Sequence, residues 1–240
     1  MVHDNVIFVL VRPQFLGNIG AAARVLKNFS FGGLALVEPP RNYKDSEARR
    51  MAVGAFDVLK NAPVFSTVSE ALADVSLAVG TSSGQQRGEM PERLQAVLPR
   101  LLEVAEANKV AFLFGDERNG LSRQDLQRCH HTVTIPVNPQ FPALNMAQAV
   151  GIIAYEMSLE RDTGKAGSPG KRFPCGTQDD ELFRQIGDLL EEIQFSRTFN
   201  KESVLREMRS AYQRFNPSCR ELDLLKGVLH RINQRLKGGT

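Results

Sequence analysis

Three short polar segments of this 240-residue chain combine residue types that bind anions and orient reacting groups. The first, GNIGAAAR at 17–24, contains Asn18 and Arg24 and follows an apolar run. Gly17 and Gly20 mark a passage from strand to helix, where exposed backbone N–H groups and the helix dipole attract negative charge. The segment lacks the third glycine of a dinucleotide-binding fingerprint and the Gly-Lys-Ser/Thr of a phosphate loop. A tight turn with a capped helix, in which Arg24 is an ordinary surface arginine, explains the same residues.

The second segment, FGDERNGLS at 114–122, directly follows another apolar run. Its Glu117 stands between Gly115 and Gly120, two residues that permit close backbone approach or a positive φ. In open α/β sheets, ligands bind at the carboxyl ends of strands, which is where we expect this segment. Part of it is structural, because Ser122 is of the residue type that caps helix N-termini.

The third segment, NPQFPALNMAQAV at 138–150, is a proline-interrupted loop that turns into a long helix. Since proline fixes φ, such a loop holds backbone groups at defined positions. The junction consists of Pro142, Ala143, Leu144 and Asn145. By themselves the prolines can simply shape a turn, so it is the combination of three such segments at strand ends that favours a binding site.

Continuous apolar runs predict the strands that position these segments. They lie at 6–11, 34–37, 75–80, 110–115 and 132–137. Runs of this length without alternation are typical of strands buried on both faces of a parallel sheet. Helical apolar spacing is found at 18–29, 91–107, 122–129 and 144–162. The alternation predicts an α/β domain over 1–162, with a parallel sheet flanked by helices.

A second domain is expected after a linker. The segment 163–177 contains four Gly and two Pro among polar residues, a composition typical of flexible linkers. Helical patterns follow at 178–194, 200–215 and 218–236. They predict a small all-helical C-terminal extension over 178–240.

The composition excludes several classes of protein. With 42% hydrophobic and 24% charged residues, the chain is neither collagenous, coiled-coil nor disordered. Apolar runs fall short of the roughly 20 residues of a membrane helix, and the first residues do not resemble a signal peptide, so we expect a cytoplasmic protein without a membrane partner. Cys129, Cys175 and Cys219 match neither a disulfide framework nor metal-ligand spacing, so no metal is expected.

Charge is distributed unevenly along the chain. The net charge is +3, yet 195–240 contains ten Lys/Arg against four Asp/Glu, which leaves the first 194 residues at −3. Such asymmetry indicates nucleic-acid contact by one segment, although a solvated helical surface has the same composition. The cations are Arg197, Lys201, Arg206, Arg209, Arg214, Arg220, Lys226, Arg231, Arg235 and Lys237. Four aromatic residues lie among them and are expected to pack inside the helical domain: Phe195, Phe199, Tyr212 and Phe215.

Taken together, the three segments resemble the motifs of the SPOUT methyltransferases, and within them those of the TrmJ-like tRNA 2′-O-ribose methyltransferases. VGTSS at 79–83 and LDLLKG at 222–227 extend the resemblance over nearly the whole chain. It implies an α/β sheet with a C-terminal deep trefoil knot, a homodimer with active sites at the subunit interface, and S-adenosylmethionine as cofactor. The implied substrate is tRNA, methylated on the ribose 2′-hydroxyl of a pyrimidine, nucleotide 32 of the anticodon loop.

The resemblance also implies roles for individual residues. Asn18, Arg24 and Glu117 correspond to catalytic positions. Cofactor contacts, mostly through backbone groups, correspond to Gly80, Thr81, Ser82, Gly115, Ile135, Pro142, Ala143, Leu144 and Asn145. Because an arginine stays protonated in proteins, we expect Arg24 to orient the ribose and an adjacent phosphate while the proton leaves by another route.

Two departures from the family pattern keep alternatives open. Ala143 stands where related enzymes usually carry serine, and the segment 82–91 has Arg87 as its only cation where they are arginine-rich. The alternatives are a catalytically weak SPOUT-fold accessory protein that binds RNA, or a methyltransferase for a different tRNA or rRNA site. A nucleotide-binding module unrelated to methylation is disfavoured, because the chain has no phosphate-loop lysine.

Overall fold

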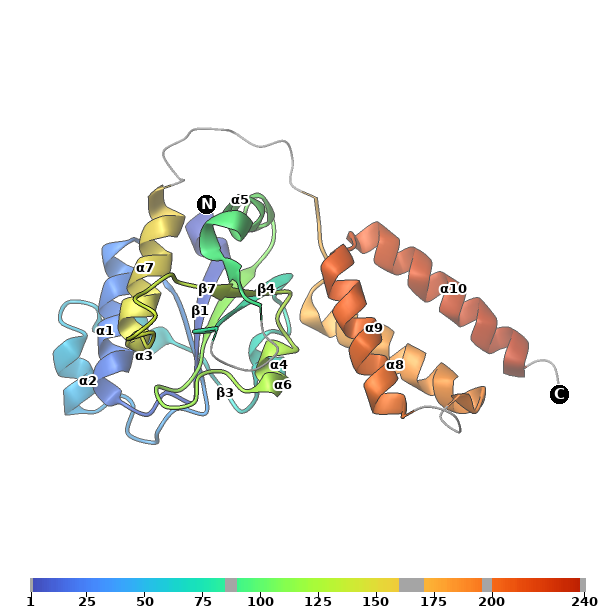
Figure 1. The fold of residues 1–240 in the computed structure, drawn as a ribbon, viewed down its shortest axis with the longest axis horizontal. Coiled ribbons are helices and arrows are strands. Elements are labelled where there is room, and N and C mark those ends of the chain that lie inside the picture. The colour runs from blue at the N-terminus through green and yellow to red at the C-terminus, as the bar shows by residue number, and fades with distance from the viewer. Residues whose placement is uncertain (1, 85–89, 160–170, 196–199, 238–240) are drawn as a thin grey trace. The chain divides into compact units, whose positions relative to one another are not determined.

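The computed structural model describes residues 2–84, 90–159, 171–195 and 200–237 (Figure 1). The chain divides into two compact units, Met1–Gly170 and Lys171–Thr240, and each is described by itself.

A seven-stranded parallel sheet forms the centre of the first unit. Its order is β3 (Val64–Phe65), β2 (Gly33–Val37), β1 (Val6–Val11), β6 (Val110–Phe114), β4 (Leu77–Thr81), β7 (His131–Thr134), β5 (Glu92–Arg93). All five predicted strands are present within it. The two-residue strands β3 and β5 at its edges were not predicted, because two residues are too few to show a pattern.

Helices cover both faces of the sheet, which is why its central strands are apolar on both sides. On one face, α1 (Leu16–Asn28) packs against α2 (Ser46–Met51), α3 (Phe56–Asn61) and α7 (Met146–Leu159), and α5 (Leu94–Ala105) also contacts α7 (Figure 1). The other face is covered by α4 (Val68–Ala71) and the region of α6 (Arg123–Leu126). There Val9 and Leu113 are buried against Leu72 and Leu121. A short 3₁₀ helix, η1 (Val2–Asn5), precedes β1.

Several boundaries differ from the predictions for local reasons. The helix expected from 91 begins at Leu94, because Glu92 and Arg93 pair with β7 as strand β5. The helix expected over 122–129 is shorter, and α2, α3 and α4 are too short to have shown a helical period. The last helix of this unit, α7, runs over Met146–Leu159, so the expected residues 144–145 belong to the preceding loop and 160–162 lie outside the described residues.

The second unit consists of α8 (Gly176–Glu192), α9 (Lys201–Phe215) and α10 (Cys219–Lys237). The helix α8 packs against both α9 and α10, and a small core forms around Leu182, Phe183 and Leu222. Because α8 begins at Gly176, the last two residues of the expected linker 163–177 are helical. Residues 163–170 of that linker lie outside the described part of the chain.

Within the described ranges, no helix has both the length and the apolar character needed to cross a membrane. The same residues contain no group of three or more His, Cys, Asp or Glu side chains placed to hold a metal ion. The three cysteines are free thiols.

Candidate functional site

The three polar segments meet at the carboxyl ends of the central strands. The turn before α1 follows β1, the segment 114–122 follows β6, and the loop that leads to α7 follows β7. In the sheet, β1 neighbours β6, and β4 lies between β6 and β7. Because all these strands are parallel, the loops that leave them emerge at the same edge of the sheet.

A chain of side-chain hydrogen bonds joins one residue from each segment. Asn18 donates from Nδ2 to Glu117 Oε1 at 2.7 Å. Its Oδ1 accepts from Nδ2 of Asn145 at 2.8 Å. The structure therefore brings together Glu117, Asn18 and Asn145, three of the residues singled out in the sequence.

Glu117 also holds the start of α1. Its Oε2 accepts the backbone N–H of Gln14 at 2.8 Å, and its Oε1 accepts that of Phe15 at 3.4 Å. Phe15 is the N-cap of α1 and its own side chain makes no capping hydrogen bond, so a carboxylate from another loop supplies the negative charge that a helix N-terminus favours. Glu117 is therefore a positioning residue. The side-chain amide of Asn18 is held in one orientation by Glu117 on one side and Asn145 on the other.

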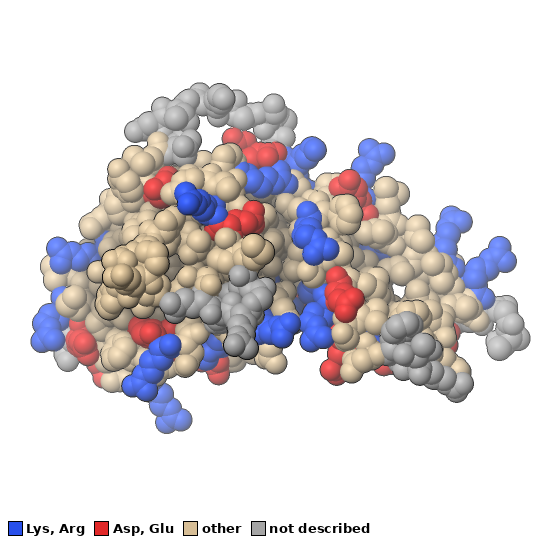
Figure 2. Space-filling model, viewed as in Figure 1, with Lys and Arg blue, Asp and Glu red and all other residues tan. Residues whose placement is uncertain are grey.

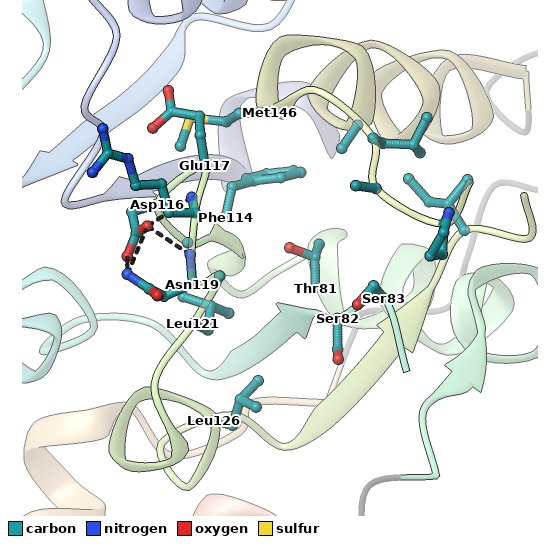
Figure 3. Close-up of a pocket in the computed structure, with 18 of the residues that line it drawn as sticks. Thr81, Ser82, Ser83, Phe114, Asp116, Glu117, Asn119, Leu121, Leu126 and Met146 are labelled. Atoms are coloured by element: carbon teal, nitrogen blue, oxygen red, sulfur yellow. Dashed lines mark hydrogen bonds between the residues drawn. The ribbon is translucent and has the colours of Figure 1, made fainter. Parts of the chain in front are cut away.

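A pocket of about 340 Å³ lies beside this chain of hydrogen bonds (Figure 3). Besides Glu117, seven of the expected cofactor residues line it: Thr81, Ser82, Gly115, Ile135, Pro142, Ala143 and Leu144. Two others do not line it, Gly80 and Asn145. Much of the apolar lining was not among the expected cofactor residues. It includes Phe114, Leu121, Leu126, Val133 and Met146. These residues lie in strands or helix turns where their apolar type indicated core packing alone.

Two glycines near the pocket are required for different structural reasons. A Cβ on Gly115 would lie 1.9 Å from the carbonyl carbon of Gly120, because the loop doubles back so that Asp116 and Gly120 form a β-bridge. A Cβ on Gly80 would lie 2.7 Å from Cδ2 of Leu126. The first glycine thus permits the loop that lines the pocket, whereas Gly80 makes room for the packing of α6 behind it.

The loop after β6 is fixed by the side chain of Asp116. Its Oδ1 accepts the backbone N–H groups of Arg118 at 2.9 Å and Asn119 at 2.8 Å, and the side chain of Asn119 turns back toward it (Figure 3). In the same view Glu117 points away from Thr81, and its carboxylate accepts from Asn18 of α1. The carboxylates of Asp116 and Glu117 therefore serve to hold backbone and side chains in place.

A partly buried ion pair, which no sequence pattern indicated, holds the same region from the other side. Asp125 is buried and is paired with Arg12, which follows β1. It also accepts from the backbone N–H of Ser122 at 2.8 Å and from its hydroxyl at 2.6 Å, completing the capping box of α6. Burial acts to raise the pKa of Asp125, but the hydrogen bonds from Arg12 and Ser122 outweigh it and hold that pKa below its usual value.

Of the three expected catalytic residues, only Glu117 lines this pocket; Asn18 is hydrogen-bonded to Glu117 beside it, and Arg24 is not brought to it. Arg24 is exposed on α1, does not line the pocket, and pairs with no side chain in the described part of the chain. In a helix, six residues correspond to about 9 Å of rise and about 240° of rotation, which places Arg24 about 120° around α1 from Asn18. A shallow groove of about 520 Å³ beside Asn18 and Asn145 runs between α1, α2 and α7, and Arg24 does not line it either.

The basic C-terminal unit uses some of its cations internally. Lys201 pairs with Glu191, and Arg209 pairs with Asp180 at 2.8 Å and lies over the ring of Phe183. Five arginines remain exposed, Arg206, Arg214, Arg220, Arg231 and Arg235, and Lys226 is half-buried. Figure 2 shows Lys and Arg side chains along α10. Arg197 and the side chain of Lys237 lie outside the described residues.

The aromatic residues of this unit behave differently from one another. Tyr212 packs edge-on against Phe183 and donates its hydroxyl to Asp179 at 2.6 Å, as expected of a core residue. Phe215 is 85% exposed, so the expectation that it packs inside was wrong. It is the last residue of α9. Phe195 is 37% exposed. Phe199 lies outside the described residues.

Comparisons with known proteins agree with this geometry. Residues 5–155 match the model of the SpoU rRNA Methylase family, and residues 178–240 match that of the tRNA methyltransferase TrmJ, C-terminal domain. The tRNA (cytidine/uridine-2′-O-)-methyltransferase TrmJ of Pectobacterium atrosepticum is 34% identical, covering 96% of this chain and 98% of that protein. Its counterpart in Salmonella typhimurium is 36% identical, covering 98% and 99%.

Solved structures give the same picture. The crystal structure of TrmJ from Z. mobilis has a TM-score of 0.80 and 31% identity, covering 95% of this chain and 98% of that one. The fold is also shared with the SpoU methyltransferase AviRb of Streptomyces viridochromogenes in complex with AdoMet, at a TM-score of 0.52 and 24% identity over 68% of this chain and 60% of that one.

Proposed function

The chain belongs to the SpoU methylase family and has the C-terminal domain of its TrmJ members, and from that premise we propose that it is an S-adenosylmethionine-dependent tRNA 2′-O-ribose methyltransferase. The observation that carries the proposal is the hydrogen-bonded chain from Glu117 through Asn18 to Asn145, which joins all three motifs beside one pocket.

The pocket fits S-adenosylmethionine in size and in the character of its lining. Its volume of about 340 Å³ is that of a small-molecule site, and it combines apolar side chains such as Leu121 and Val133 with the polar groups of Thr81 and Ser82. Apolar walls suit the adenine ring, and the close turn at Gly115 presents backbone groups to it. When bound, the cofactor supplies a methyl group on a sulfonium, which is an activated leaving group.

The residues of the chain then have to align the ribose hydroxyl and remove its proton. Asn18 is held between Glu117 and Asn145, so its amide is presented in one orientation without reorganisation during the reaction. Arg24 contributes a guanidinium that orients the ribose and an adjacent phosphate. It cannot serve as a base, because it stays protonated.

The placement of Arg24 supports a homodimer. Arg24 lies about 120° around α1 from Asn18 and does not line the pocket, so we infer that it acts on a reaction centre in another copy of the chain. We therefore propose active sites at a subunit interface, each combining the pocket of one copy with Arg24 of the other. The lining of the groove beside Asn18 includes the small residues Ala21 and Gly151, which permit close helix approach.

The finer details of the substrate and fold follow from the relatives. We propose a pyrimidine at nucleotide 32 of the tRNA anticodon loop as the target, consistent with relatives named for cytidine and uridine. The exposed arginines of α9 and α10 then bind tRNA phosphates. The deep trefoil knot of SPOUT proteins is proposed for the stretch that ends in α7, in keeping with the return of Asn145 to Asn18 across the strand ends.

Ala143 favours one second candidate, an accessory protein that binds RNA and holds cofactor poorly. It lines the pocket at the position of the usual serine, so no hydroxyl is available there. Calorimetric titration of the purified protein with S-adenosylmethionine separates the two functions. Saturable binding supports the enzyme, whereas no heat change at millimolar cofactor would overturn it in favour of the accessory protein.

A further inference from the structure

Arg118 is a cation at the mouth of the pocket, and it has no role in the proposed reaction. It is exposed, it lines the pocket, and it is the only Lys or Arg among the described lining residues. Its guanidinium makes no hydrogen bond or ion pair with any side chain in the described ranges. The two other charged residues of the lining are Asp116 and Glu117, so the charge of Arg118 is opposite to that of its neighbours.

The backbone from which Arg118 projects is held rigidly. The N–H of Arg118 donates to Asp116 Oδ1 at 2.9 Å, and the N–H of Gly120 donates to the Asp116 carbonyl at 2.9 Å. Asp116 and Gly120 also form a β-bridge, and a Cβ on Gly115 would lie 1.9 Å from the carbonyl carbon of Gly120, so the two ends of the loop lie close together. The side chain therefore starts from a fixed point beside the reaction centre, which lowers the ordering cost of a contact with substrate.

The charges at the mouth of the pocket favour a role for Arg118 in binding phosphate. A tRNA strand that enters this mouth brings phosphates close to the carboxylates of Asp116 and Glu117. Both carboxylates are already occupied by N–H donors of the protein. Among the charged lining residues, only Arg118 has no side-chain partner in the part of the chain that the structure describes, and its planar fork matches the geometry of a phosphate.

On these grounds we propose that Arg118 is a substrate-binding residue that contacts a backbone phosphate of the tRNA next to the target ribose. The inference rests on the proposed function, because it takes tRNA as the substrate. It adds an anion contact from the catalytic unit itself, separate from the basic surface of the C-terminal unit.

The test compares R118Q with R123Q in the full-length protein. Arg123 is an exposed arginine of α6 that does not line the pocket, so R123Q removes the same charge from the same region. Binding of total tRNA from cells lacking the gene is measured over a range of salt concentrations, and binding of S-adenosylmethionine is measured by calorimetry. R118K is included because it keeps the charge and loses the fork.

We expect R118Q to weaken tRNA binding about tenfold, the scale of one charge-assisted contact, and to reduce the slope of log affinity against log salt by roughly 0.7–0.9. R118K should recover the salt slope but only part of the affinity. R123Q should match the parent, and the affinity for the cofactor should be the same in all variants.

Equal tRNA binding by R118Q and R123Q in an active enzyme would refute the role of Arg118 and leave the proposed function standing. Weakened cofactor binding with unchanged tRNA binding would instead assign Arg118 to the cofactor carboxylate and overturn the proposal. A parent that binds neither ligand would overturn the proposed function as well.

Discussion

Substitution of Glu117 by glutamine tests how the three motifs are held together. The carboxylate accepts two backbone N–H groups before α1 and the side-chain amide of Asn18. Glutamine has nearly the same shape but keeps one acceptor oxygen and removes the negative charge at the helix N-terminus. The loss of one partly exposed hydrogen bond, at about 0.5–1 kcal/mol, together with a dipole contribution of about 0.3–1 kcal/mol, amounts to roughly 1–2 kcal/mol.

That loss should appear in both stability and turnover. For a protein of this size it lowers Tm by about 3–6 °C, measured by calorimetry or circular dichroism. Turnover in a methyl-transfer assay with tRNA should fall at least about tenfold, because Asn18 and the loop lose their fixed orientation. The matched control is E106Q, since Glu106 is exposed and has no partner among the described side chains. If E117Q retained the Tm and turnover of E106Q, the assignment of Glu117 as the residue that joins the motifs would be wrong.

Four further predictions concern the loop at Gly115, the role of Arg24, the Asp125 carboxylate and the exposed arginines of α10. Gly115→Ala should abolish cofactor binding in calorimetry, because the new Cβ would lie 1.9 Å from backbone, whereas Gly32→Ala, with nothing within 4 Å, should bind normally. Arg24→Lys should lower kcat more than tenfold in the methyl-transfer assay without changing Tm, because a point charge does not replace a bidentate fork; unchanged turnover would count against this role. Because its folded pKa is lowered, the Asp125 carboxylate stabilises the fold above its unfolded pKa of about 3.9 and loses this contribution as pH falls through the folded value. Tm should therefore drop more steeply between about pH 5 and 3 in the parent than in D125N, and parallel profiles would contradict the assignment. Neutralising three exposed arginines that share a face of α10 should reduce the salt slope of tRNA binding by up to about 2.7 without affecting cofactor binding. These are Arg220, Arg231 and Arg235.

The sequence predicted the central part of the fold because the physical signal there is strong. Strands such as β1 and β6 are covered on both faces, so they are continuous apolar runs bounded by polar turns. The edge strand β5 consists of Glu92 and Arg93, which are exposed and form a strand only because β7 lies beside them. No local pattern could distinguish those two residues from the first turn of the following helix.

Residue type and family resemblance were enough to single out most residues of the candidate site, but not the contacts between them. Asn18 and Asn145 are 127 positions apart, and their contact depends on the order in which the strands assemble. Spacing likewise could not show that Gly80 serves the packing of α6. The pairing of Arg12 with Asp125 left no signal beyond the capping residue at Ser122.

Mass spectrometry of ribose-methylated nucleosides in tRNA and rRNA, from cells with and without the gene, tests the central claim most directly. Loss of a 2′-O-methylated pyrimidine from a subset of tRNAs, restored by the parent gene but not by one encoding Arg24→Lys, is the predicted result. An unchanged set of 2′-O-methylated nucleosides in tRNA would contradict the proposed function, and a loss confined to rRNA would contradict its substrate.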